Sequence, residues 1–517
     1  MLRYPVVLGV VLLNFIILLH VRADSQLNAQ CIECHESSGI DQTVFLKSVH
    51  GDLSCIECHS GYDVSKHATK PIPAPEGKSV LVAKLGTKSK APLALLSCDK
   101  CHPDVIEQLS LSIHSTWLRE NLPAAGPICS DCHGSTHNIE KSGTRNERNY
   151  SKLNRCAACH KQNSEVVPTY YDSVHGRLIS IGSNKAPACH DCHGSHNILA
   201  AASIDSPVSP QNKARTCAKC HTGADNRFAA VITHKPVAHG SHPGPHWTHV
   251  FFSYLTTLTL LGLSGHIALD FSSEIRMRFR RRKRETHDKT LFIGMPQSVV
   301  RLDIHQRIQH WLLIASVILL VLTGWPLRAA LLGPSRSLVA LFGGPHGAAI
   351  VHRFAAFLLI FAAIYHLVYL TVIAFKGKLR FSMMPTFKDV TDLFQNLTFF
   401  IGLRHERPRF GKFSYVEKFD YWAVFWGTAI MVGTGFIYWF PVQFSAWIPS
   451  WVINAAQLAH GEEATLAALA LFVWHFYNVH MRPSIFPMNW AWLNGRISTE
   501  MLYEEHRLEY EKLKKNN

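Results

Sequence analysis

Charged residues are scarce in this chain of 517 residues: Asp, Glu, Lys and Arg make up 17% of it, and hydrophobic residues 47%. The mean hydropathy of +0.04 is high for a soluble protein and low for a chain embedded throughout in a membrane. The sequence also lacks any cysteine outside seven C-x-x-C pairs. Composition therefore predicts a hybrid of a soluble and a membrane part, and the absence of a leftover cysteine excludes a disulfide framework as the main use of the thiols.

A histidine directly follows each of the seven pairs. Because histidine occupies only 32 of the 517 positions, chance would place one after all seven pairs about once in 10⁸ to 10⁹ sequences. C-x-x-C-H is the attachment signature of c-type haem, so we predict seven covalently bound c haems. Structural zinc knuckles would leave the seven histidines unexplained. The predicted thioether cysteines are Cys31, Cys34, Cys55, Cys58, Cys98, Cys101, Cys129, Cys132, Cys156, Cys159, Cys189, Cys192, Cys217 and Cys220.

The histidine of each motif is the predicted proximal ligand of its haem iron. These proximal histidines are His35, His59, His102, His133, His160, His193 and His221.

Acidic residues are also few: 37 Asp and Glu stand against 52 Lys and Arg, which gives a formal net charge of +15. Such a charge is typical of proteins that bind nucleic acid or anionic membranes. Here the number omits the two propionates of each predicted haem, and much of the positive charge lies in loops beside apolar spans. We therefore predict no nucleic-acid partner.

Residues 1–23 combine Arg3, an apolar run over 6–19 and small residues before Asp24. This pattern is typical of a secretory signal peptide, with an uncleaved membrane anchor as the alternative. In both cases the following segment is exported to the side of the membrane on which c-type haem is attached.

Five later stretches are apolar and long enough to cross a bilayer, which needs about 20 residues. Basic residues crowd the loop after the first span and the loop between the third and fourth, whereas the other two connections hold one arginine between them. The positive-inside rule therefore predicts a bacterial inner-membrane protein with residues 24–246 in the periplasm and the C-terminus in the cytoplasm. The predicted spans are residues 247–271, 308–331, 347–375, 420–441 and 451–477.

The predicted fold is mostly α-helical, with a loop-rich multihaem cytochrome c domain followed by a bundle of five membrane-spanning helices. Mixed Glu and Lys residues over 500–515 predict a solvated amphipathic helix near the C-terminus. The expected segments are a signal peptide (1–23), a periplasmic haem domain (24–246), a linking membrane helix (247–275), a basic cytoplasmic loop (276–307), a four-helix membrane domain (308–482) and a cytoplasmic tail (483–517).

Residues 24–246 repeat internally, because the first cysteines of alternate pairs stand at 31, 98, 156 and 217, spaced by 58 to 67 residues. Each unit carries a histidine between its two motifs, in S-V-H-G or S-I-H-S, and another after the second motif, as in C-H-G-S-x-H. These are the predicted distal ligands, which close the sixth position of an iron. The candidates are His50, His67, His114, His137, His175, His196 and His234.

An iron with two imidazole ligands has no open position, so such haems transfer electrons and do not bind substrate. The many distal histidines and the lack of a C-x-x-C-K motif argue against a terminal reductase of a small inorganic substrate, which stays an alternative. With about 32 residues per haem, the polypeptide cannot build a large apolar core. We therefore expect short helices and much loop in this domain.

Ionisable residues inside membrane spans are costly and usually functional. His352 and His366 in the third span, and His460 and His475 in the fifth, are each separated by about 21 Å along one helix face. Two such helices could hold two b haems, with His352 and His460 near the outer surface and His366 and His475 near the inner one. His310, at the start of the second span, competes with His366 for the inner position.

The S-V-H-G and C-H-G-S-x-H elements resemble those of periplasmic multihaem cytochromes c, which implies an electron-conducting domain. R-I-Q-H-W at 307–311, T-G at 323–324 and H-F-Y-N-V-H at 475–480 resemble the dihaem cytochrome b subunits of formate dehydrogenase and nickel-iron hydrogenase. Carried over, this second resemblance pairs His310 with His475 and His352 with His460. It leaves His366 without a haem to bind.

These features predict electron exchange between the membrane quinone pool, menaquinone or ubiquinone, and periplasmic cytochromes, other redox proteins or extracellular acceptors. A quinol:cytochrome c-type oxidoreductase is the main prediction, and quinone reduction by a periplasmic donor is the alternative. The resemblance to the cytochrome b subunits places the quinone near the inner haem. Candidates for the quinone site are Glu417, Lys418, Asp420 and His480, and His266 in the first span is a ligand, a quinone-site group or a packing residue.

Overall fold

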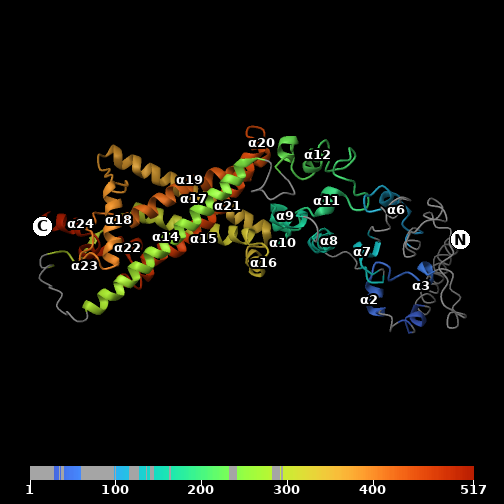
Figure 1. Ribbon diagram of the computed structural model, residues 1–517, viewed down its shortest axis with the longest axis horizontal. Helices are drawn as coiled ribbons and strands as arrows, with labels where there is room; N and C mark the ends of the chain where they lie inside the picture. Colours follow the sequence, from blue (N-terminus) through green and yellow to red (C-terminus); the bar gives the residue numbers. More distant parts are fainter. Residues whose placement is uncertain are drawn as a thin grey trace, which may run out of the picture. The chain divides into compact units, whose positions relative to one another are not determined.

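The structure is a computed structural model, and its internal contacts divide the chain into two units (Figure 1). One unit comprises Met1–Ile179 and Ser183–Asn226, and the other Ser180–Gly182 and Arg227–Asn517. The predicted signal peptide, Cys34, His67 and His234 lie outside the described residues. The structure describes residues 28–33, 35, 40–59, 98, 100–115, 127, 129–135, 137–139, 145–161, 165–231, 242–281, 292 and 295–516.

The N-terminal unit is loop-rich, as predicted. Several C-x-x-C-H motifs form single helical turns, which place the two cysteines of a motif on the same face of the helix. Its one described apolar cluster is small and contains Leu153, Tyr170, Ile179, Ala186 and Ala188. The described helices are α2 (Gln42–Lys47), α3 (Cys55–Cys58), α6 (Pro103–Ser110), α7 (Cys129–His133), α8 (Arg145–His160), α9 (Val166–Asp172), α10 (Val174–Ser180), α11 (Cys189–His193), α12 (Lys213–Ala218) and α13 (Asn226–Ala229).

Five helices of the second unit are long and apolar enough to cross a membrane, which confirms the predicted number of spans. The first span is much longer than predicted, because its helix continues into the arginine-rich segment. The fifth ends in two π-helical turns, a geometry that often marks functional positions. The helices are α14 (Pro243–Arg281), α15 (Ile304–Arg328), α17 (Gly344–Phe375), α19 (Tyr415–Trp439) and α21 (Ser450–Ala470), which continues into η6 (Leu471–His475) and η7 (Tyr477–Met481).

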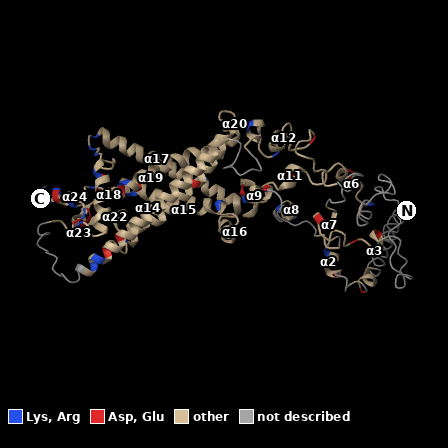
Figure 2. Cartoon of the chain, in the orientation of Figure 1, with Lys and Arg blue, Asp and Glu red and all other residues tan. Residues whose placement is uncertain are grey.

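Helices α15, α17, α19 and α21 form a four-helix bundle in which α15 packs mainly on α17, and α19 on α21. Helix α14 packs against α21 (Figure 1). Large apolar side chains such as Phe354, Phe361 and Phe472 are 58% or more exposed, as expected for a surface that faces lipid. The long helices carry few charges along their middle stretches (Figure 2). The protein is therefore an integral membrane protein.

Shorter helices join the long ones. Helix α16 (Gly333–Ala340) links α15 to α17, and α20 (Pro441–Ser445) links α19 to α21. Helix α18 (Phe387–Phe400) lies between α17 and α19 in the chain and packs on both α14 and α19.

The C-terminal tail folds against the segment that precedes α15. Strand β1 (Ser298–Val300) pairs antiparallel with β2 (Arg496–Ser498), with Val299 opposite Ile497. Beside it lie α22 (Ala491–Asn494), α23 (Thr499–Glu505) and α24 (Arg507–Asn516). The prediction of one solvated helix over 500–515 is wrong, because Leu502 and Tyr510 are buried in a cluster with Ile497. Three-residue strands are too short to show an alternating pattern in the sequence.

Candidate haem centres

Among the described residues of the N-terminal unit, five pairs of histidine rings lie opposite one another. Two imidazoles that bind one metal ion from opposite sides, each through a nitrogen at about 2 Å, would have ring centroids about 6.3 Å apart. The observed distances of 6.1 to 6.5 Å fit this spacing. The pairs are His50 with His102 (6.5 Å), His59 with His137 (6.1 Å), His114 with His160 (6.2 Å), His133 with His196 (6.1 Å) and His175 with His221 (6.2 Å).

Each pair joins one motif histidine to one predicted distal candidate, so five of the seven distal candidates stand opposite a motif histidine. The two other distal candidates are those outside the described residues. The remaining motif histidines, His35 and His193, also take part in contacts.

Histidines of the membrane bundle form a sixth such pair. The ring centroids of His310, on α15, and His475, at the end of η6, lie 6.3 Å apart. The Nδ1 of His475 lies 3.0 Å from Oδ2 of Asp420 on α19. A carboxylate that accepts this N–H fixes the ring orientation and directs Nε2 to a metal. This arrangement fits one iron between α15 and η6.

The competing residue His366 is engaged through both ring nitrogens. Its Nδ1 lies 2.9 Å from Oε1 of Gln309, and its Nε2 lies 2.9 Å from the hydroxyl of Tyr421. Neither nitrogen is left for a metal ion in this arrangement. The side chain instead connects α17 to α15 and α19.

His352 and His460 occupy matching places in the two halves of the bundle. The hydroxyl of Thr323 donates to the carbonyl of Leu319 and therefore accepts from Nδ1 of His352, at 2.9 Å. The hydroxyl of Thr434 is placed in the same way, 3.1 Å from Nδ1 of His460. Both histidines keep Nε2 for a metal.

A glycine follows each of these threonines. A Cβ at Gly324 would lie 3.1 Å from Cε1 of His352, and one at Gly435 would lie 3.3 Å from Cε1 of His460. The T-G dipeptide thus supplies both a hydrogen-bond acceptor and the space for a ring. Because the second T-G dipeptide, at 434–435, is also visible in the sequence, this internal symmetry is a signal that sequence reasoning missed.

The predicted quinone-site residues are distributed over different contacts. Glu417 accepts from Arg301 at 2.7 Å and caps the backbone of Ser414 at the start of α19. Lys418 forms an ion pair with Asp389 at 2.8 Å. Asp420 contacts His475, and His480 packs on the ring of Phe476, with centroids 4.7 Å apart. The structure therefore does not gather these four side chains around one cavity.

His266 joins α14 to the bundle. Its Nε2 lies 2.7 Å from the hydroxyl of Tyr415, which also accepts from Asn396 of α18. The ring packs against Trp474, with centroids 4.9 Å apart. Of the roles considered for His266, packing is the one that its contacts fit.

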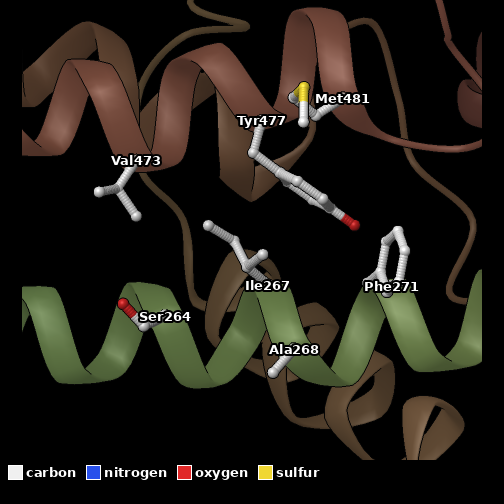
Figure 3. A pocket seen from close by; sticks show the side chains of 7 residues that line it. All are labelled: Ser264, Ile267, Ala268, Phe271, Val473, Tyr477 and Met481. Atoms are coloured by element: carbon white, nitrogen blue, oxygen red, sulfur yellow. The ribbon is translucent and has the colours of Figure 1, made fainter.

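A groove of about 330 Å³ lies between α14 and the π-helical turns. Figure 3 shows its lining, in which Val473, Tyr477 and Met481 face α14. The hydroxyl of Tyr477 donates to Oδ2 of Asp270 at 2.8 Å. The rest of the groove is almost entirely apolar, as expected for a surface in contact with acyl chains.

A buried group of charges, which sequence reasoning missed, ties α14 to the tail. Arg482 contacts Oδ2 of Asp270 at 3.0 Å, Oε2 of Glu505 at 2.9 Å and Oε1 of Glu274 at 3.5 Å. Arg407 contacts Glu274 at 2.5 Å. These five residues, the α14 charge cluster, come from four separate parts of the chain.

Residues 301–485 match the family model of prokaryotic cytochrome b561. No curated protein matches the chain. The matched segment contains all four helices of the bundle and the histidines on them, whereas α14 and the N-terminal unit lie outside it. This segment is therefore similar to membrane b-type cytochromes, a family that binds b haems and transfers electrons across membranes.

Proposed function

We propose that the protein transfers electrons between the membrane quinone pool and redox proteins on the far side of the membrane, in the direction of quinol oxidation. Two b haems in the bundle and seven c haems in the N-terminal unit would carry them. The recurring imidazole spacing supports the proposal most directly, because it occurs five times among the described residues of the N-terminal unit and again at His310 and His475.

In this proposal the b haems are held by His310 with His475 and by His352 with His460. The c haems are held by the fourteen motif cysteines and by the motif and distal histidines. Haem that is ligated by two imidazoles supplies one-electron transfer and has no position open for substrate. A terminal reductase, which needs such a position, is therefore the weaker candidate.

The protein's own residues orient the ligands of the bundle. Thr323, Thr434 and Asp420 each hold the Nδ1 side of a histidine, so that Nε2 points to the iron. Asp420 is therefore a positioning residue for His475. The ion pairs of Glu417 and Lys418 anchor the start of α19, so we place the quinone near the His310 and His475 pair without a role for these two residues.

The proposed topology follows from the basic segments. Lys and Arg gather where α14 ends and in the segments on either side of α18 (Figure 2). By the positive-inside rule this end of the bundle lies in the cytoplasm, and the N-terminal unit is exported behind its signal peptide to the periplasm. Quinol would then be oxidised near the cytoplasmic end, with electrons leaving through the c haems.

Haem analysis and quinol-driven reduction test the proposal together. A pyridine haemochrome assay of the purified protein is expected to give c and b haem in a ratio near 7:2, from seven motifs and two histidine pairs. Adding menaquinol to the protein in liposomes is expected to reduce both haem types. Absence of b haem, or b haems that menaquinol leaves oxidised, would overturn the proposal.

The glycine beside His460 offers a separate prediction. Gly435→Val is expected to push the ring of His460 out of place and to lower the b haem content from two to one, because even a Cβ there is 3.3 Å from the ring. Gly433→Val is the matched control two residues away, where nothing lies within 4 Å of a Cβ. Equal b haem content in the two variants would contradict the proposed site.

A further inference from the structure

The five histidine pairs among the described residues of the N-terminal unit all join different repeats. Repeat 1 carries the motifs of His35 and His59, repeat 2 those of His102 and His133, repeat 3 those of His160 and His193, and repeat 4 that of His221. Three distal candidates each lie opposite the first motif histidine of the following repeat, and we call them the forward histidines: His50, His114 and His175. Two others each lie opposite the second motif histidine of the preceding repeat, and we call them the backward histidines: His137 and His196.

One backbone contact recurs where neighbouring repeats meet. The N–H of Val49, which precedes the first forward histidine, donates to the carbonyl of Ile139 at 2.8 Å. The N–H of Ile113 donates to the carbonyl of Ile198 at the same distance. In both cases the acceptor stands two residues after a backward histidine. Each such contact therefore lies beside both a forward and a backward histidine. It positions the first to face the following repeat and the second to face the preceding repeat.

The turn that presents the forward histidine also recurs. The N–H of His50 donates to Oγ of Ser48, and that of His114 to Oγ of Ser112, both at 3.2 Å. Both serines are at most 1% exposed. Side chain to backbone bonds of this kind set the local conformation, so the S-x-H sequence builds the same turn in the first two repeats. In the third repeat, Oγ of Ser173 accepts from the N–H of Gly176 instead, at 3.2 Å.

The cysteines show the order of the motifs. Within a repeat, the first cysteines of the two motifs are hydrogen-bonded, as in Cys98 with Cys129. The other hydrogen-bonded pairs within a repeat are Cys31 with Cys55 and Cys156 with Cys189. Between repeats, the second cysteine of one motif lies near the first motif of the next repeat, as for Cys58 with Cys101, Cys132 with Cys156 and Cys192 with Cys217.

We propose that the haem sites of the N-terminal unit form a single file in sequence order, in which each repeat supplies the sixth ligand for haems of its neighbours. This inference rests on the proposed function, because it takes the motifs as haem sites. The unit is then a set of interlocked repeats whose stability depends on contacts between neighbours. The motif of His221 becomes the end of the file that is nearest along the chain to α14.

The proposal predicts which haem a distal histidine controls. His114→Met, made in the full-length protein, is expected to convert one haem to histidine and methionine ligation. That change has its own magnetic circular dichroism signature and raises one reduction potential. The signature should disappear when Cys156→Ser and Cys159→Ser remove the haem of the following repeat. It should remain when Cys98→Ser and Cys101→Ser remove the haem that precedes His114 in its own repeat.

A second set of variants repeats the comparison at the end of the file. The signature of His175→Met should disappear with Cys217→Ser and Cys220→Ser, and remain with Cys189→Ser and Cys192→Ser. The last haem has only one neighbouring haem. Its removal therefore tests the pairing without leaving a gap inside the row of haems, which the fold would have to tolerate. Intact mass should show six haems in each of these proteins.

His190 provides the control, because it lies inside the motif of α11 with Nε2 3.9 Å from the carboxylate of Asp191. His190→Met is expected to give no new signature. A signature that disappears with the haem of the histidine's own repeat would overturn the shared ligation and leave the proposed function standing. A protein without c haem would instead overturn the proposed function.

Discussion

Replacing His310 with leucine is expected to remove one of the two b haems and to stop quinol-driven reduction of the c haems. His310 and His475 form the only pair at imidazole spacing among the described residues of the bundle, and leucine cannot ligate iron. Loss of a residue that only hydrogen-bonds to a metal ligand lowers metal affinity or activity about 10 to 100-fold. Loss of the ligand itself should therefore lower the rate at which menaquinol reduces the c haems by more than about 100-fold. Haemochrome spectra and stopped-flow reduction by menaquinol measure both effects.

His366→Gln is the matched control, since His366 lies at the same level on the neighbouring helix. Its two nitrogens already contact Gln309 and Tyr421, and glutamine can keep one of these hydrogen bonds. Both b haems and the reduction rate should therefore stay near their wild-type values. The assignment fails if His366→Gln loses a haem and His310→Leu retains both.

Replacing Arg482 with methionine is expected to lower the free energy of unfolding by about 3 to 5 kcal/mol, the usual cost of removing one partner from a buried ion pair. The Arg482 side chain is 13% exposed and contacts Asp270, Glu274 and Glu505. Burial alone would raise the pKa of Glu505, but Arg482 and Arg407 outweigh it and hold that pKa below its usual value. Without Arg482, three carboxylates share Arg407.

Arg409→Met is the control for this change. The Arg409 side chain is 60% exposed and lies 3.6 Å from Glu511, and such surface pairs contribute at most about 1 kcal/mol. Unfolding of both variants in mixed detergent micelles, followed by circular dichroism, gives the comparison. Equal losses for the two arginines would show that the α14 charge cluster does not stabilise the fold.

Features encoded within short stretches could be predicted from the sequence. A C-x-x-C-H motif occupies five consecutive residues, so its chemistry is visible without any tertiary contact. The five spans were equally accessible, because a helix in lipid must be apolar over about 20 residues whatever it packs against. Distal candidates such as His114 were found by comparing one repeat with the next.

The sequence left open which histidines face one another. His310 and His366 stand at the same depth on adjacent helices, and their roles differ because His310 faces His475 while His366 is held by Gln309 and Tyr421. The repeats likewise reveal the forward and backward histidines without revealing that each faces a neighbouring repeat. Side-chain partners depend on packing between segments that are distant in the chain.

The C-terminal tail and the α14 charge cluster show the same limit. Glu and Lys over 500–515 have the composition of a solvated helix, and the short strand that covers Leu502 and Tyr510 lies about 200 residues earlier. Asp270 and Arg482 are 212 residues apart in the chain and 3.0 Å apart in the structure. Local patterns report the preferences of nearby residues, whereas the energy of a buried charge or an apolar cluster depends on partners that only folding brings together.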